Sequence, residues 1–124
     1  PNLKTRSILK VPLRFPDGST VVVYGVHLPS QANPVSQRKE ILEILKGAIV
    51  KDGRPFLVAG DFNITATEES NEKLLEKTVG DIAEISHFVG CQSCQGTHYY
   101  RHSWSFLDII LVSKSLKNKT SSCA

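Results

Sequence analysis

The sequence predicts a mixed α+β fold, because strand-like apolar runs alternate with segments whose apolar residues recur at helical spacing. Three runs, residues 20–28, 56–61 and 105–113, are rich in Val, Ile, Leu and Phe and are typical of buried strands. A longer segment between the first two runs carries apolar residues three and four positions apart, as one face of a helix does. We therefore expect helices packed on a sheet, in one domain or part of one that covers residues 1–124 without an internal boundary.

The first half of the chain is expected to form a hairpin and a helix before the second apolar run. Residues 8–16 and 20–28 are expected to be two strands joined by a Pro-Asp-Gly-Ser turn. Asn33 is expected to cap the following helix, with Pro34 at its first position, and the helix is expected to end near Asp52. The apolar face of this helix, which we expect to pack on the sheet, consists of Ile41, Leu42, Leu45, Ala48 and Ile49.

A second helix is expected to begin near Thr67, where Glu68 and Glu69 interact favourably with the helix dipole. Its inward-facing residues are expected to be Leu74, Leu75 and Val79. A short buried element is expected after it, formed by Ile82, Ile85, Phe88 and Val89. A strand at residues 97–101 and the run at 105–113 complete the predicted elements.

A carboxylate and a carboxamide stand at the end of the predicted strand at residues 56–61. The sequence at this point is Gly60-Asp61-Phe62-Asn63. Aspartate supplies charge for a hard cation or a base for water, and asparagine donates a neutral hydrogen bond to an oxyanion. The alternative is a strand that ends in an Asx turn, because Gly, Asp and Asn all favour turns.

Two more polar residues stand at strand ends. His27 lies at the end of residues 20–28, and Asp108 lies near the start of residues 105–113. If the last of these strands is antiparallel to the other two, Asp108 falls at the same sheet edge as His27 and Asp61. Each has a structural alternative: His27 as a half-buried core histidine, and Asp108 as a helix cap or a salt-bridge partner. Taken together, three polar groups at one edge predict a functional site.

Three sequence boxes occur in order: Tyr24-Gly25-Val26-His27-Leu28, Gly60-Asp61-Phe62-Asn63, and Gly96-Thr97-His98-Tyr99-Tyr100-Arg101 leading into Trp104-Ser105-Phe106-Leu107-Asp108. In these boxes the chain resembles the endonuclease/exonuclease/phosphatase superfamily, which has the deoxyribonuclease I-like fold. The resemblance extends from about Ile8 to Leu116. It implies part of a four-layer α/β/β/α sandwich, in which two packed sheets are flanked by helices and the site lies at the strand ends.

The resemblance also implies an activity, the hydrolysis of phosphodiester or phosphomonoester bonds with Mg²⁺ or Mn²⁺. Members of the family act on DNA or RNA, on phospholipids or on inositol phosphates, so the expected partner is a phosphate ester. Asp61 would orient or deprotonate the attacking water and contact the metal, and Asn63 would hold this aspartate, the metal or the phosphate. His27 would donate a hydrogen bond to the phosphate, and Asp108 would orient a catalytic histidine.

Two residues are expected near the substrate. By resemblance, Trp104 would lie by the substrate pocket; its alternative is a role as an aromatic core residue. Arg38 stands on the first predicted helix, near the end of the sheet that carries the polar groups. It is expected either to reach a phosphate or to form a surface salt bridge.

The chain departs from the family pattern near both ends. Family members carry an asparagine and a metal-binding glutamate on earlier strands, and a Ser-Asp-His segment that supplies the histidine served by Asp108. This sequence contains no Asp-His pair, and its other histidines, His87, His98 and His102, all precede Asp108. We therefore expect a partial domain that is weakly active or inactive by itself. The alternative function is a non-catalytic binding module that retains the fold.

Composition sets few limits on function. Fifteen Lys and Arg against twelve Asp and Glu give a net charge of +3, too mild for a nucleic-acid footprint. No apolar segment approaches the roughly 20 residues that a membrane-spanning helix needs. Cellular location and oligomeric state are left open.

The spacing of Cys91 and Cys94 matches that of a zinc-binding pair. A zinc site needs a second ligand pair, and the spacer from Cys94 to His98 is far too short for a zinc finger. We therefore favour a local disulfide or two free thiols over zinc at this pair.

Overall fold

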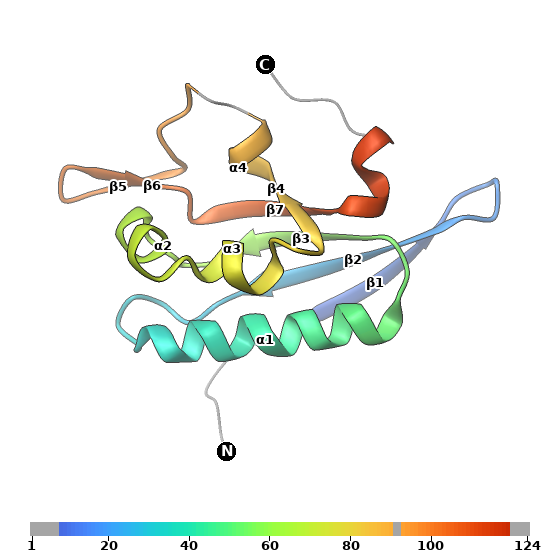
Figure 1. Cartoon of the computed structure of the whole chain (residues 1–124), viewed down its shortest axis with the longest axis horizontal. Helices are drawn as coiled ribbons and strands as arrows, with labels where there is room; N and C mark the ends of the chain where they lie inside the picture. The colour runs from blue at the N-terminus through green and yellow to red at the C-terminus, as the bar shows by residue number, and fades with distance from the viewer. Residues whose placement is uncertain (1–7, 91–92, 120–124) are drawn as a thin grey trace.

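The computed structural model describes residues 8–90 and 93–119 and shows the expected mixture of helices and strands (Figure 1). In chain order the elements are β1 (Leu9–Arg14), β2 (Thr20–His27), α1 (Val35–Asp52), β3 (Phe56–Asp61), α2 (Ala66–Glu72), α3 (Leu74–Val79), β4 (Ala83–Ile85), α4 (Ser86–Val89), β5 (His98–Tyr100), β6 (Ser103–Ser105), β7 (Asp108–Ser113) and a 3₁₀ helix (Lys114–Lys119).

Five strands form one sheet in the order β1-β2-β3-β7-β4, and β5 pairs with β6 in a separate hairpin. Strands β2 and β3 are parallel, with α1 as the crossover between them, and β7 is antiparallel to β3. The last strand thus has the antiparallel direction that would place Asp108 at the same sheet edge as His27 and Asp61. Figure 1 shows that the β5–β6 hairpin and α2 lie at the end of the sheet where β2 and β3 finish and β7 begins.

Helix α1 provides much of the core, because its buried positions recur at helical spacing. Ile41, Leu42, Leu45 and Ile49 are buried together with alternate residues of β2 and β3. Ala48, which we expected on this face, is exposed. Leu74, Leu75 and Val79 of α3 are buried as predicted.

The start of α1 differs from the prediction. Helix α1 begins at Val35, and Pro34 occupies the N-cap position with an extended backbone, so Asn33 lies outside the helix. The side-chain amide of Asn33 donates instead to the backbone oxygen and hydroxyl of Ser30. Asn33 therefore stabilises the turn before the helix rather than capping the helix.

The single helix expected after residue 67 is two helices. Thr65 caps α2 by accepting a hydrogen bond from the backbone of Glu68, and Lys73 separates α2 from α3 with a left-handed backbone (φ 51°). The carboxylate of Glu69 accepts hydrogen bonds from the first backbone N–H groups of α3, at 2.9 Å from Leu75 and 3.3 Å from Glu76. The first N–H groups of a helix have no partner within the helix. The carboxylate of Glu69 supplies that partner here, so a new helix can begin directly after α2.

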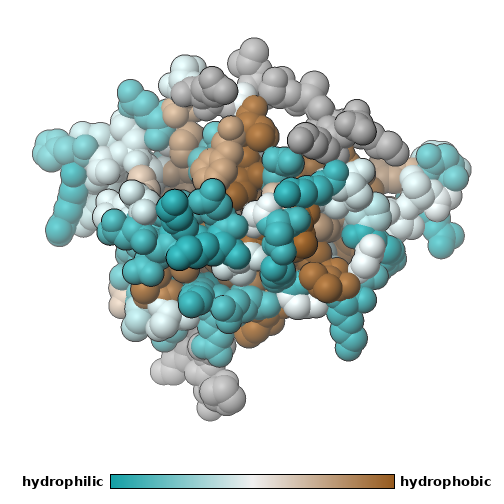
Figure 2. All heavy atoms as spheres, viewed as in Figure 1, coloured by the Kyte–Doolittle hydropathy of each residue, from teal (hydrophilic) through white to brown (hydrophobic). Residues whose placement is uncertain are grey.

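The segment after α3 is only partly buried. Ile85 in β4 is buried, but Phe88 and Val89 in α4 are about half exposed, so their predicted burial is wrong. Figure 2 shows hydrophilic side chains over α2 and α3 and apolar atoms gathered beside them over α4. The long strand expected at 105–113 begins only at Asp108, because residues 103–105 turn back to pair with β5.

The predicted cysteine pair and the absence of a long apolar segment can be compared with the structure only in part. Cys94 is in a disulfide bond, and its partner lies outside the described residues, as does Cys91. Within residues 8–90 and 93–119, no helix is both long enough and apolar enough to span a membrane.

One face of the five-stranded sheet carries apolar side chains that are exposed or partly exposed; we call it the open face. Its members are Leu9, Val11, Leu13, Val21, Val23, Leu57, Ile110 and Val112, which share cross-strand rows of the sheet. Leu9 is 64% and Ile110 49% exposed, whereas the residues that alternate with them on β2, β3 and β7 are buried in the core. An apolar sheet face of this kind marks a surface that another layer covers.

We predict that replacing Ile110 by lysine reduces self-association of the 124-residue chain. A charged side chain in the middle of the open face opposes burial of that face against another molecule. Because Ile110 is half exposed, the free energy of unfolding should change by less than about 0.5 kcal/mol. Sedimentation velocity measures the association, and Ile44→Lys, at a half-exposed position of α1, is the matched control. Equal association of the two variants would contradict the role assigned to the open face.

Candidate functional site

His27, Asp61 and Asp108 lie in one row across three neighbouring strands. His27 is the register partner of Asp61 in the parallel β2–β3 pair, and Asp61 is the partner of Asp108 in the antiparallel β3–β7 pair. Residues in such a row project from the same face of a sheet. Nε2 of His27 lies 3.7 Å from Oδ2 of Asp61, and both side chains are partly exposed. The structure therefore brings these three predicted residues together.

Asp61 also closes a turn. Its Oδ1 accepts a hydrogen bond of 2.9 Å from the backbone N–H of Asn63, which is the geometry of an Asx turn. The turn that we considered as the alternative is thus present, while Oδ2 remains on the side of His27. Gly60 precedes it with φ 153°, and a Cβ there would lie 1.9 Å from the backbone oxygen of Val26. Glycine is required for this close contact between β2 and β3.

Asn63 is held by its neighbours in a left-handed backbone conformation (φ 52°). Its side-chain N–H donates to the backbone oxygen of Leu28 at 2.8 Å, and its backbone oxygen accepts from Gln31 Nε2 at 2.6 Å. The backbone of Asn63, and not its side chain, holds Asp61. Because Nδ2 is bound to Leu28, the amide of Asn63 has a fixed orientation beside the carboxylate.

Arg38 is not at the surface of the site. It is 1% exposed, and its guanidinium donates to the backbone oxygens of Pro29, Ser30 and Asn33 and forms an ion pair with Glu68. Both expectations for Arg38, a phosphate contact and a surface salt bridge, are therefore corrected to a buried structural ion pair. Its physical role is to tie the β2–α1 loop to α2.

A cleft of about 540 Å³ adjoins the row and contains Asp61 and Asn63. The rest of its wall comes from Ser30, Gln31, Ala32, Thr65, Thr67, His98, Tyr100, Ser103, Ser105 and Leu107. Gln31, Thr65 and Ser105 were not among the predicted site residues. Gln31 follows the strand that ends at His27, and Ser105 precedes Asp108. Polar residues so close to predicted site residues were the sequence signal that could have placed them in the cleft. His98, which belongs to the third sequence box but was given no role in the site, also lines this cleft.

The β5–β6 hairpin is anchored beside the cleft by Thr97. Its hydroxyl oxygen accepts hydrogen bonds of 3.1 Å from the backbone N–H groups of Leu107 and Asp108. His98 and Tyr100 line the cleft, whereas Trp104 lines a separate cavity. Trp104 is 43% exposed, so it is not a core residue, and it is not in the cleft that contains Asp61.

The described residues do not form a complete metal site. Among residues 8–90 and 93–119, no three His, Cys, Asp or Glu side chains are placed to share an ion. The oxygens of Asp61 and Asn63 are suitable ligands for Mg²⁺, but that ion takes six ligands in near-octahedral geometry. The donor set in this part of the chain is therefore incomplete.

Several solved structures have a similar fold. One is an endonuclease/exonuclease/phosphatase family protein from Bacteroides thetaiotaomicron (20% identity, TM-score 0.55, 81% of this chain and 38% of that chain). Another is the human Nocturnin catalytic domain with bound sulfate (21% identity, TM-score 0.55, 83% and 39%). A third is the beta toxin of Staphylococcus aureus, as a mutant with bound magnesium ions (16% identity, TM-score 0.56, 79% and 39%). A search of curated proteins found no match.

These similarities establish the fold, a deoxyribonuclease I-like α+β architecture, of which the chain is a part. The chain spans well under half the length of the three solved structures. This agrees with the expectation of a partial domain. A family model described as Endonuclease/Exonuclease/phosphatase family matches residues 4–123, and the chain therefore belongs to that family.

Proposed function

We propose that the protein to which this chain belongs hydrolyses phosphodiester or phosphomonoester bonds with the help of Mg²⁺ or Mn²⁺. The observation that carries the proposal is the row of His27, Asp61 and Asp108 beside a polar cleft. Ionisable side chains at adjacent strand positions, next to a cleft, are suited to acid–base and electrostatic catalysis. Nucleic acids, phospholipids and inositol phosphates are the candidate substrates.

Asp61 is the proposed residue that orients or deprotonates the attacking water. One of its oxygens is fixed by the backbone of Asn63, so the other has a defined direction towards His27. His27 donates a hydrogen bond to the phosphate oxygen, where negative charge increases in the transition state. The fixed amide of Asn63 contacts the phosphate or the metal. Asp108 orients a histidine supplied by another part of the protein, because no second histidine lies in this row.

A divalent cation is proposed as cofactor because the cleft offers oxygen ligands. Asp61 and Asn63 would contribute to its coordination, and the remaining ligands would come from other parts of the protein. When bound, such a cation polarises the phosphoryl group and stabilises the charge that develops on it. The S. aureus beta toxin structure, which contains magnesium ions, supports this cofactor for the family fold.

Hydrolysis of bis-p-nitrophenyl phosphate by the full-length protein, with Mg²⁺ and then with excess EDTA, tests the proposal. We expect release of p-nitrophenolate that EDTA abolishes and fresh Mg²⁺ restores. The 124-residue chain alone should be far slower, because catalytic groups that act as a unit lose most of their effect when one is missing. No hydrolysis by the full-length protein, with this or with natural phosphate esters, would favour the non-catalytic module.

We predict that His27→Asn reduces kcat of the full-length protein by about 10²–10³-fold, the usual effect of losing one transition-state donor. His102→Asn is the matched control, because His102 lies in the β5–β6 turn with φ 64°, a conformation that asparagine adopts readily. His102 lies outside the row of His27, Asp61 and Asp108 and lines neither the cleft nor the adjacent cavity, so its replacement should leave kcat unchanged. Equal rates for the two variants would exclude the role proposed for His27.

A further inference from the structure

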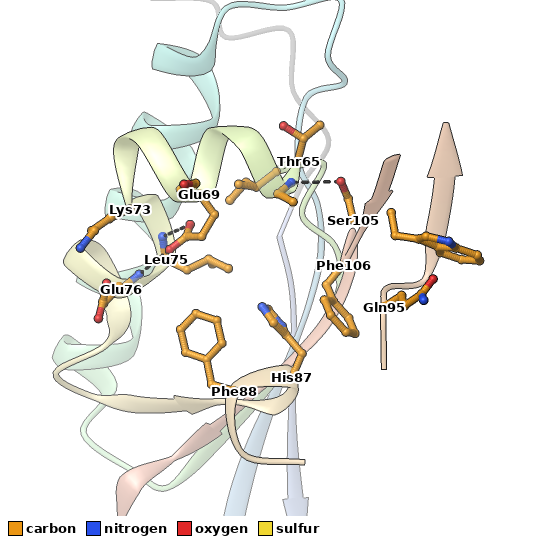
Figure 3. A pocket seen from close by; sticks show the side chains of 14 residues that line it. Thr65, Glu69, Lys73, Leu75, Glu76, His87, Phe88, Gln95, Ser105 and Phe106 are labelled. Carbon is orange, nitrogen blue, oxygen red and sulfur yellow. Dashed lines mark hydrogen bonds between the residues drawn. The ribbon is translucent and has the colours of Figure 1, made fainter. Parts of the chain in front are cut away.

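A cavity of about 360 Å³ is lined by residues of α2, α3, α4 and β6 (Figure 3). Its apolar walls are formed by Ile64, Leu75, His87, Phe88, Trp104 and Phe106. A volume of this order is suited to a small molecule or to one group of a larger ligand. The function proposed above makes no use of this cavity.

His87 is the most unusual residue of the cavity. Its ring is stacked on Phe106, with centroids 4.3 Å apart and 9° between the planes, and it meets Phe88 edge-on at 4.6 Å. Its Nδ1 is buried without a hydrogen-bond partner among the described residues. Burial lowers the pKa of His87 below the ordinary value of 6.5, so the ring is neutral at pH 7. A stacked, neutral imidazole with an unpaired nitrogen needs an explanation.

The burial of Nδ1 indicates which nitrogen carries the proton. A buried N–H without an acceptor is rarer than a buried acceptor without a donor, so we place the proton on Nε2. Figure 3 shows the imidazole ring of His87 directed towards the space bounded by Leu75 and Phe106. The cavity therefore combines flat aromatic surfaces with one N–H donor.

The charges around the cavity disfavour an anion. Glu69 and Glu76 line it, against one lysine, Lys73. The carboxylate of Glu69 is already engaged with the backbone N–H groups at the start of α3. A second phosphate group would meet like charge here, whereas a neutral ring would not. A saturated chain would fill the space but would leave the N–H of His87 without a partner.

The cavity and the cleft are neighbours. Thr65 and Ser105 belong to the walls of both. Ser105 is fixed by a hydrogen bond of 3.0 Å from the backbone N–H of Ala66 to its hydroxyl, which joins α2 to the β5–β6 hairpin. A phosphate held in the cleft would therefore lie next to the cavity, with this shared wall between them.

We propose that this cavity binds a neutral, planar heteroaromatic ring, such as a nucleobase, with an acceptor on its edge for Nε2–H of His87. The ring stacks against the aromatic walls, as bases do on protein side chains. If the protein has the function proposed above, on which this assignment rests, its substrate belongs to the nucleotide class and places its phosphate in the cleft. Inositol phosphates lack the ring, and lipid chains lack the acceptor.

Fluorescence of Trp104 in the 124-residue chain tests the inference, because Trp104 is the only tryptophan in the sequence. Excitation at the red edge of its absorption avoids absorption by the probe, which is adenosine. Adenosine carries no phosphate, so its binding does not depend on catalysis. We expect a saturable change in emission with adenosine and none with 1-hexanol or with myo-inositol. A saturable change with 1-hexanol equal to that with adenosine, or no change with adenosine, overturns the proposal.

Two variants locate the binding. His87→Phe keeps the stacking and removes the N–H, and we expect about tenfold weaker binding of adenosine. His98→Phe makes the same change on the cleft side of the hairpin and should leave Kd unchanged. Ser70→Phe adds a ring at an exposed residue of the cavity rim and should abolish binding without touching the core. Circular dichroism checks that each variant is folded. If His87→Phe does not fold, the loss of adenosine binding in Ser70→Phe tests the assignment instead.

Equal affinity of His87→Phe and the unchanged chain, or binding retained in Ser70→Phe, would overturn the assignment. The two proposals fail in different ways. Adenosine binding without hydrolysis by the full-length protein would remove the catalytic function and leave the ring site. Hydrolysis of bis-p-nitrophenyl phosphate without adenosine binding would leave the catalytic function and remove the ring site.

Discussion

Replacing Asp61 by asparagine is expected to reduce kcat/KM of the full-length protein for bis-p-nitrophenyl phosphate by about 10²–10⁴-fold. Asparagine has nearly the same shape but cannot take a proton from water or supply a negative charge to a cation. The oxygen that loses its charge lies in the row with His27 and Asp108. Initial rates at saturating Mg²⁺ measure the effect, and single-turnover rates separate chemistry from binding.

Asparagine is the informative substitution because it preserves the turn. The amide oxygen of Asn at position 61 can still accept the hydrogen bond from the backbone of Asn63, so the strand end keeps its geometry. Asp81→Asn is the control, since Asp81 forms an exposed ion pair with Lys46 at 3.0 Å on another part of the surface. An unchanged rate in the Asp61 variant would show that Asp61 serves the turn alone.

The sequence predicted the strand ends well because two local signals coincide there. Apolar runs set the length of each buried strand, and His27 and Asp61 interrupt those runs at the point where the strands leave the core. The side-chain period of two then places the polar groups on one face once the register is known. The register itself depends on pairing between distant strands, which no local pattern gives.

The misassigned residues depend on contacts between distant parts of the chain. Arg38 is buried because Glu68, thirty residues later, and three loop carbonyls surround it. Long charged side chains are normally exposed, so a sequence pattern favours the surface. Lys73 is similar: its left-handed backbone is stabilised by the cap that Glu69 provides to α3. Helical spacing continues through Lys73 and gives no sign of the break.

The walls of the cleft and the adjacent cavity were beyond prediction for another reason. They form where the β5–β6 hairpin folds against α2 through Ser105 and Ala66. The sequence predicted one strand from Ser105 through Asp108 to Ser113, with Ser105 in the same strand as Asp108 rather than in a separate hairpin. The separate hairpin puts Trp104 and His98 in different pockets.

Replacing Arg38 by alanine is expected to destabilise the chain by about 3–5 kcal/mol, the cost of removing one partner from a buried ion pair. Three backbone oxygens in the β2–α1 loop would lose their donor, and Glu68 would lose its counter-charge. Urea denaturation, followed by circular dichroism, measures the change in the free energy of unfolding. Lys46→Ala, which breaks the exposed ion pair with Asp81, should cost only about 0–1 kcal/mol.

Arg38 is also connected to the site, and the same variant tests this connection. Gln31 Nε2 donates both to Glu68 and to the backbone oxygen of Asn63, so a chain of hydrogen bonds runs from Arg38 to the cleft. The double variant Arg38→Met with Glu68→Leu removes both charges and should recover part of the lost stability. It should nevertheless lower the rate of the full-length protein, because Gln31 loses its hydrogen bond to Glu68 and keeps only the one to Asn63. A cost below 1 kcal/mol for Arg38→Ala, or full activity of the double variant, would contradict this arrangement.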